Sequence, residues 1–80
     1  MKLVDCLMER TTLEQLLREA DTLLWRGELN IAKQREIIAL REQRGEDASA
    51  EKTRLRRLEN RQARHIADRN RLFKQLADRS

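Results

Sequence analysis

The sequence predicts an all-α fold, an antiparallel two-helix hairpin of the coiled-coil type. Three observations support this prediction. The 80 residues include no proline and only two glycines, so long stretches of the chain lack a helix breaker. Strong helix formers dominate the composition, and 40% of the residues are charged. Apolar residues recur at alternating steps of three and four, which is the spacing of one helical face packed against another.

The first predicted helix begins near residue 12, after a short N-terminal leader over residues 1–11. Thr11 with Glu14, or Thr12 with Gln15, has the spacing of a capping box, in which two side chains satisfy free backbone N–H groups reciprocally. Either pair predicts a helix start at this point.

The face of this helix that is expected to contact a partner helix follows steps of four and three without interruption. Its members are Leu13, Leu17, Ala20, Leu24, Gly27, Ile31, Gln34 and Ile38. Gly45 is the natural end of the helix, because glycine adopts the left-handed conformation of a C-terminal cap without steric cost. The first helix is therefore predicted over residues 12–44.

A loop over residues 45–48 separates it from a second helix, predicted over about 49–78. Asp47 or Ser49 is the candidate cap, since the side-chain oxygen of either residue can accept a hydrogen bond from a backbone N–H at a helix N-terminus. The predicted contact face of this helix is weaker and partly polar. It contains Leu55, Leu58, Gln62, Ile66, either Arg69 or Asn70, Phe73 and Leu76.

Folding the chain at this loop gives a helical hairpin over residues 12–80. The expected pairs include two in which a small residue faces a large one, as interdigitating side chains require. The expected pairs are Ile38 with Leu55, Ile31 with Gln62, Gly27 with Ile66, Ala20 with Phe73, and Leu17 with Leu76. One uninterrupted helix is the alternative, and the glycine at position 45 argues against it.

Several large apolar residues lie outside the predicted contact face and favour self-association. Trp25 and Leu29 lie on the outer side of the first helix, and Leu16, Leu23, Ile37 and Leu40 widen its apolar surface. One alternative is that Trp25 and Leu29 are isolated exposed residues or pack on the leader. The prediction is a homodimer, in which two hairpins form a four-helix bundle and these six residues form the protein interface.

Positive charge is concentrated in the second half of the chain. Residues 1–43 hold seven Lys and Arg against eight Asp and Glu, whereas residues 44–80 hold eleven against six. The arginines at helical spacing are Arg54, Arg57, Arg61, Arg64 and Arg71. One interpretation is a solvated row that bridges to the acidic residues of the first helix. The alternative is a nucleic-acid contact, with Arg54, Arg57, Arg61 and Arg64 pairing with phosphates.

The sequence holds no recognisable catalytic, cofactor or metal site. A single Cys6 and a single His65 are too few for a protein-only zinc site, and no glycine-rich phosphate loop or paired-histidine motif occurs. No stretch has the apolar length of a membrane span, and charges interrupt the N-terminal segment where a secretory signal would be uniformly apolar. We therefore expect a non-enzymatic cytoplasmic protein without cofactors or membrane partners.

Two segments resemble those of small uncharacterised bacterial proteins that form helical hairpins. The first runs Leu17-Arg18-Glu19-Ala20-Asp21, continues with Gly27-Glu28, and includes Ile31 to Ile38; the second is Gln62 to Leu72. The resemblance covers most of residues 13–76. It implies a hairpin fold and a bacterial cytoplasmic setting, and it implies no activity or site.

These observations lead to two functional hypotheses. The first is a small helical module for protein–protein interaction and oligomerisation, which self-associates and docks a further protein partner. The second is a nucleic-acid-associated regulator that uses the arginine-rich side of the second helix.

Overall fold

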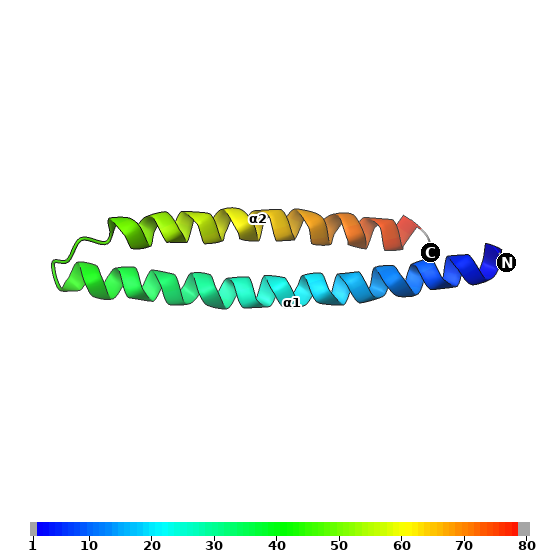
Figure 1. Ribbon diagram of the computed structural model, residues 1–80, viewed down its shortest axis with the longest axis horizontal. Helices are drawn as coiled ribbons and strands as arrows, with labels where there is room; N and C mark the ends of the chain where they lie inside the picture. Colours follow the sequence, from blue (N-terminus) through cyan, green and yellow to red (C-terminus); the bar gives the residue numbers. More distant parts are fainter. Residues whose placement is uncertain (1, 79–80) are drawn as a thin grey trace.

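The computed structural model describes residues 2–78, with side chains from residue 10 onward, and it is a two-helix hairpin. Helix α1 spans Lys2–Gln43 and α2 spans Ser49–Asp78, and the described residues include no strand. The helices run antiparallel along their whole shared length (Figure 1), in a body of 65 × 15 × 14 Å. The all-α hairpin that the sequence predicts is therefore confirmed.

Helix α1 begins at Lys2, whereas the sequence placed its start near residue 12. The helix passes through Thr11 and Thr12 without interruption, so the capping-box spacing there does not mark a helix end. The first turns of α1 extend past the end of α2 (Figure 1), because α1 has 42 residues and α2 has 30. The predicted leader is thus a continuation of α1, and the side chains of its first nine residues, including Cys6, lie outside those described.

The turn between the helices is held by a glycine and by backbone hydrogen bonds. Gly45 has φ of 72°, the left-handed conformation predicted for it. Its N–H donates to the Glu42 carbonyl at 3.0 Å, and the Glu46 N–H donates to the Arg41 carbonyl at 2.9 Å. This pair of bonds is the Schellman motif, which satisfies carbonyls at the end of α1 and reverses the chain.

Asp47 then organises the start of α2. Its Oδ1 atom accepts hydrogen bonds from the Ser49 hydroxyl at 2.6 Å and from the Ser49 backbone N–H at 3.0 Å. These bonds, led by the one from the hydroxyl, hold the pKa of Asp47 below its ordinary value, with help from the nearby charge of Lys52. Of the two candidate caps, Asp47 is therefore the acceptor, and Ser49 donates to it.

The contact face of α1 is the one predicted. All eight predicted positions are buried or half-buried, and Ile38 retains only 7% of its exposure. Leu13, Ala20, Ile38 and Ala48 form the buried apolar core among the described residues, and no large side chain there is completely enclosed. The core is thin because each helix has a single neighbour.

The contact face of α2 differs from the prediction at two positions. Ile66 and Phe73 were expected against α1, but they are 45% and 52% exposed. His65 and Leu72 are half-buried in their place, whereas Leu76 and, of the two alternatives, Arg69 are half-buried as predicted. The four residues are His65, Arg69, Leu72 and Leu76. They continue the strict alternation of three and four from Leu58 and Gln62, so the periodicity of packing prevails over the apolar character of single residues.

Gln62 fixes the register between the helices, and it faces Gly27. Its Nε2 atom donates to the Leu24 carbonyl at 2.9 Å, and a methyl group added at Gly27 would overlap its Oε1 atom. The expected pairs of Gly27 with Ile66 and of Ile31 with Gln62 are therefore wrong by about one helical turn. Nearer the loop, Gln34 is also buried, and its Nε2 atom donates to the Glu51 carbonyl at 3.1 Å.

Candidate interaction surfaces

The hairpin has two broad sides, because each helix contacts the other along one face only. The candidate residues predicted from the sequence all lie on these sides or on the outer edges of the helices.

One side carries an apolar row on α1. Leu16, Leu23 and Ile37 are separated by seven or fourteen residues, so they lie in line along the helix, and Leu40 stands one turn after Ile37. All four are between 41% and 46% exposed. Within the hairpin this row has no counterpart to cover it.

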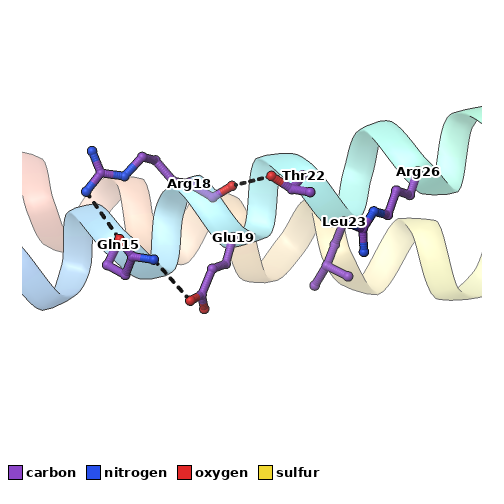
Figure 2. Close-up of a pocket in the computed structure, with 6 residues that line it drawn as sticks. All are labelled: Gln15, Arg18, Glu19, Thr22, Leu23 and Arg26. Atoms are coloured by element: carbon purple, nitrogen blue, oxygen red, sulfur yellow. Dashed lines mark hydrogen bonds between the residues drawn. The ribbon is translucent and has the colours of Figure 1, made fainter.

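Figure 2 shows the surroundings of Leu23 in a hollow on the outer side of α1. The Gln15 amide donates to Glu19 at 3.3 Å and accepts from Arg18 at 3.3 Å, which ties these polar side chains together. The Leu23 side chain projects on the same side of α1 as the Glu19 carboxylate, one turn further along the helix (Figure 2). The apolar row is therefore bordered by polar side chains that already bond to each other.

The predicted arginine row lies on α2. Arg54, Arg57, Arg61 and Arg64 are exposed and follow steps of three and four, so they share one side of the helix. Among the described residues, none of these four makes an ion pair. The acidic residues of α1 that were expected to bridge to the row are engaged elsewhere or alone: Asp21 pairs with Arg69, and Glu14 pairs with Arg10. That bridging interpretation is wrong for these arginines.

The two rows border each other across the groove between the helices. Ile37 and Arg54 line one hollow together with Gln34, Ala50 and Glu51, which places the apolar row of α1 beside the arginine row of α2. Arg26 and Lys33 stand three residues after Leu23 and four before Ile37, and they make no ion pair within the described part of the chain. We call this side, with its apolar row and its arginine row, the basic face.

The opposite side carries paired charges. Arg35 bonds to Glu59 at 3.1 Å, Lys52 bonds to Glu42 at 3.2 Å, and both pairs join α1 to α2. Near the far end of the hairpin, Arg69 bonds to Asp21 at 2.7 Å. The side chains of these pairs are exposed, apart from the half-buried Arg69, and each pair contributes at most about 1 kcal/mol. Together the pairs leave this side close to neutral.

Both aromatic residues of the chain lie on this neutral side. Lys52, Glu59, Ile66 and Phe73 are each seven residues apart, so the last two continue the row that makes the interhelical ion pairs. The Arg69 guanidinium lies 5.5 Å from the centroid of the Phe73 ring, in a cation–π contact.

Trp25 stands one turn after Asp21 on α1 and is 63% exposed. Leu29 stands one turn further, on the outer edge of that helix. We call Trp25, Leu29, Ile66 and Phe73 the aromatic face.

The six predicted interface residues therefore divide between two surfaces. Trp25 lies about 200° around α1 from Leu23, so no single flat contact covers both. Ile66 and Phe73 were missed as surface residues, and the alternation of three and four carried on from Gln62 would have identified them. The interface role of all six residues stays a prediction, as does a nucleic-acid role for the four arginines.

Among the described residues, three side-chain atoms are buried without a hydrogen-bond partner: Glu51 Oε2, Gln62 Oε1 and His65 Nδ1. The other carboxylate oxygen of Glu51 bonds to Arg41 at 3.0 Å. Over the described residues, no three His, Cys, Asp or Glu side chains gather where a metal ion could be held. Glu51, Gln62 and His65 lie at positions of α2 that pack against α1.

Neither helix has, over its described length, an apolar window able to cross a bilayer. Comparisons with models of protein families, with curated proteins and with solved structures found no match. The resemblance to small bacterial helical hairpins stays a prediction.

Proposed function

We propose that the protein is a non-catalytic helical interaction module that self-associates through its aromatic face. The observation that carries this proposal is the exposure of Trp25 and Phe73, at 63% and 52%, on a side whose charges are already paired. Aromatic side chains are the usual anchors of protein interfaces, because they bury a large area with few rotatable bonds.

A second copy of the chain is the partner that suits this face. A two-fold contact places the same patch on both sides, so it requires a surface that does not repel itself. Ion pairs between Arg35 and Glu59, and between Arg69 and Asp21, provide that neutrality here. Packing two hairpins by this face gives a four-helix bundle, which covers side chains that one hairpin leaves exposed.

Light scattering on the purified chain tests the proposal. At tens of micromolar, we expect a mass twice that of the chain. Replacing both aromatic residues, Trp25→Ser with Phe73→Ser, should give the monomer mass. Leu23→Ser is the matched control on the opposite side and should leave the dimer intact. A monodisperse wild-type monomer at this concentration would contradict the proposal.

A nucleic-acid-associated role is the second candidate, and the four arginines without ion pairs favour it. Guanidinium groups pair well with phosphate. Because these four arginines make no ion pair with a described residue, none would have to be broken for them to bind phosphate. The apolar row beside the arginines argues against it, because a phosphate backbone offers nothing to cover exposed leucines. The interaction module is therefore the function that we propose.

A further inference from the structure

We propose that the basic face binds an acidic amphipathic helix of a different protein, which lies in the groove between α1 and α2 and completes a three-helix bundle. The inference rests on the proposed role as an interaction module. It does not depend on self-association, since the two faces lie on opposite sides of the hairpin.

The apolar row has the spacing that a packed third helix requires. Leu16, Leu23 and Ile37 follow a heptad repeat interrupted only by Asn30, and Leu40 extends the row by one turn. From Leu16 to Leu40 the row is about 36 Å long, at about 1.5 Å per residue. A partner helix with apolar residues at alternating steps of three and four would meet this row over about three heptads.

The charges beside the row specify an acidic partner. Arg54, Arg57, Arg61 and Arg64 border the row on the α2 side, and Arg26 and Lys33 flank it on α1. None of these six cations makes an ion pair with a described residue. Glutamates flanking the apolar stripe of a partner helix would meet these cations in the positions where coiled coils place their interhelical ion pairs.

A second copy is a poor occupant of this face. Two basic faces packed together would bring their arginine rows close to each other, and like charges across an interface cost free energy. The described acids near this side are few. Glu19 already accepts from Gln15, and Asp68 pairs with Arg71. Glu51, in the hollow beside Arg54, pairs with Arg41. Asp78 continues the line of Arg57 and Arg64 only at the end of α2, fourteen residues beyond Arg64. Charge complementarity therefore selects a partner different from the chain itself.

A lipid surface and a nucleic acid match the face less well. Membrane-surface helices commonly anchor through aromatic residues, and both aromatics of this chain lie on the opposite side. A nucleic acid would satisfy the arginines and leave the apolar row uncovered. An acidic helix satisfies both rows at once.

Fluorescence anisotropy with a labelled synthetic peptide tests the proposal on the full chain. The probe is a helical peptide of about three heptads with leucine at the two core positions and glutamate beside them. Its twin carries lysine in place of glutamate. We expect the acidic peptide to bind, its affinity to fall as salt is raised, and the lysine twin to show no binding.

Variants locate the binding on the basic face. Arg57→Glu with Arg61→Glu should weaken binding at least about tenfold, since it reverses two charges beside the peptide. The matched control is Arg56→Glu, because Arg56 lies on another side of α2 and donates only to the Thr53 hydroxyl. Leu23→Ser should also weaken binding at unchanged charge. Circular dichroism checks that each variant keeps its helical content, and the pair Arg57→Gln with Arg61→Gln replaces the reversal if it unfolds.

Several outcomes would overturn the proposal. They are no binding of the acidic peptide at low salt, equal binding of the lysine twin, or an equal loss in Arg56→Glu. Tighter binding to phosphatidylserine vesicles, duplex DNA or single-stranded RNA under the same conditions would assign the face to that ligand instead.

Failure here is distinguishable from failure of the dimer. The Trp25→Ser, Phe73→Ser chain should still bind the peptide, and the Arg57→Glu, Arg61→Glu chain should keep its dimer mass. Loss of peptide binding in the aromatic variant would show that the faces are not independent, which would also contradict the proposal.

Discussion

At the scale of single residues, the turn depends on a few local interactions that the chain makes with its nearest neighbours. Gly45 adopts φ of 72°, and Asp47 accepts two hydrogen bonds from Ser49 at the start of α2. A carboxylate at this point also lies favourably at the positive end of the helix dipole. The Asp47 contribution to stability therefore depends on its negative charge.

That dependence predicts a pH effect. The pKa of Asp47 is lowered in the folded chain, so its contribution is present above the unfolded-state pKa and is lost as pH falls through the folded-state pKa. Asp47→Asn keeps the shape and removes the titration. We expect the wild type to melt above this variant at pH 7, and the gap to shrink below about pH 4, where free aspartate titrates. Thermal melts followed by circular dichroism measure the gap.

The other carboxylates are the same in the wild type and in Asp47→Asn. Their titration therefore affects both melting temperatures and cancels in the gap between them. A gap in melting temperature that is constant from pH 7 to pH 2 would show that the Asp47 charge contributes nothing. Sequence reasoning identified Gly45 and left Asp47 and Ser49 as alternatives. The end of α1 and the start of α2 each depend on a few neighbouring residues, so the chemistry of their side chains alone allows a prediction.

At the scale of the helices, prediction succeeded for one contact face and failed for part of the other. On α1, apolar residues occupy nearly every contact position, so the period of burial can be read directly. On α2, the contact positions include Gln62, His65 and Arg69, while Ile66 and Phe73 are exposed. A contact face predicted from the apolar residues of α2 is therefore rotated from the observed one, because a contact between two helices cannot cover every apolar residue.

The register also escaped prediction because it depends on a contact between distant residues. Gln62 reaches the Leu24 carbonyl only because Gly27 lacks a side chain at the closest approach. Likewise, the ion pair between Arg69 and Asp21 follows from that alignment. Helical spacing alone leaves the two helices free to slide by one turn.

The contact between Gly27 and Gln62 predicts an energetic coupling. In an isolated helix, Gly27→Ala would stabilise by about 1 kcal/mol through propensity. In this chain the new methyl group displaces the Gln62 amide, and the hydrogen bond that is lost is worth about 0.5–1.5 kcal/mol. We expect Gly27→Ala to be nearly neutral in the wild type and to stabilise by about 1 kcal/mol when Gln62→Ala is already present.

Urea unfolding of the four chains in this cycle measures the coupling. Each free energy should be compared at one protein concentration, since association also stabilises the folded state. Equal effects of Gly27→Ala in both backgrounds would mean that the Gln62 amide does not fill the space beside Gly27. The register drawn from this contact would then need revision.

At the scale of the whole molecule, the hairpin is a narrow body with two dissimilar sides. The sequence predicted six exposed apolar residues and four exposed arginines, but it grouped Trp25 with Leu23 in one interface and placed Ile66 and Phe73 between the helices. The packing of α1 against α2 shows that Trp25 and Leu23 lie on opposite sides, because the side of an exposed residue is defined by where the partner helix lies. The same packing shows that Arg54 and Arg61 are unpaired, which charge counting could not establish.

The thin core predicts that stability depends on association. Leu13 and Ile38 are the only large aliphatic residues that are buried among the described positions, so burial within one hairpin is limited and the proposed dimer would add to it. Binding of a second copy stabilises the folded state by mass action, and the melting temperature then rises with protein concentration. We expect a clear rise for the wild type between about 1 and 100 µM, the range in which weak homodimers form.

The aromatic face should carry this dependence. Trp25→Ser with Phe73→Ser should give a lower melting temperature that does not change with concentration, because the monomer then has no partner. Leu23→Ser, on the basic face, should keep the dependence of the wild type. A wild-type melting temperature that stays constant over the same range would mean that the hairpin is stable alone, and that its exposed aromatic residues serve a contact other than self-association.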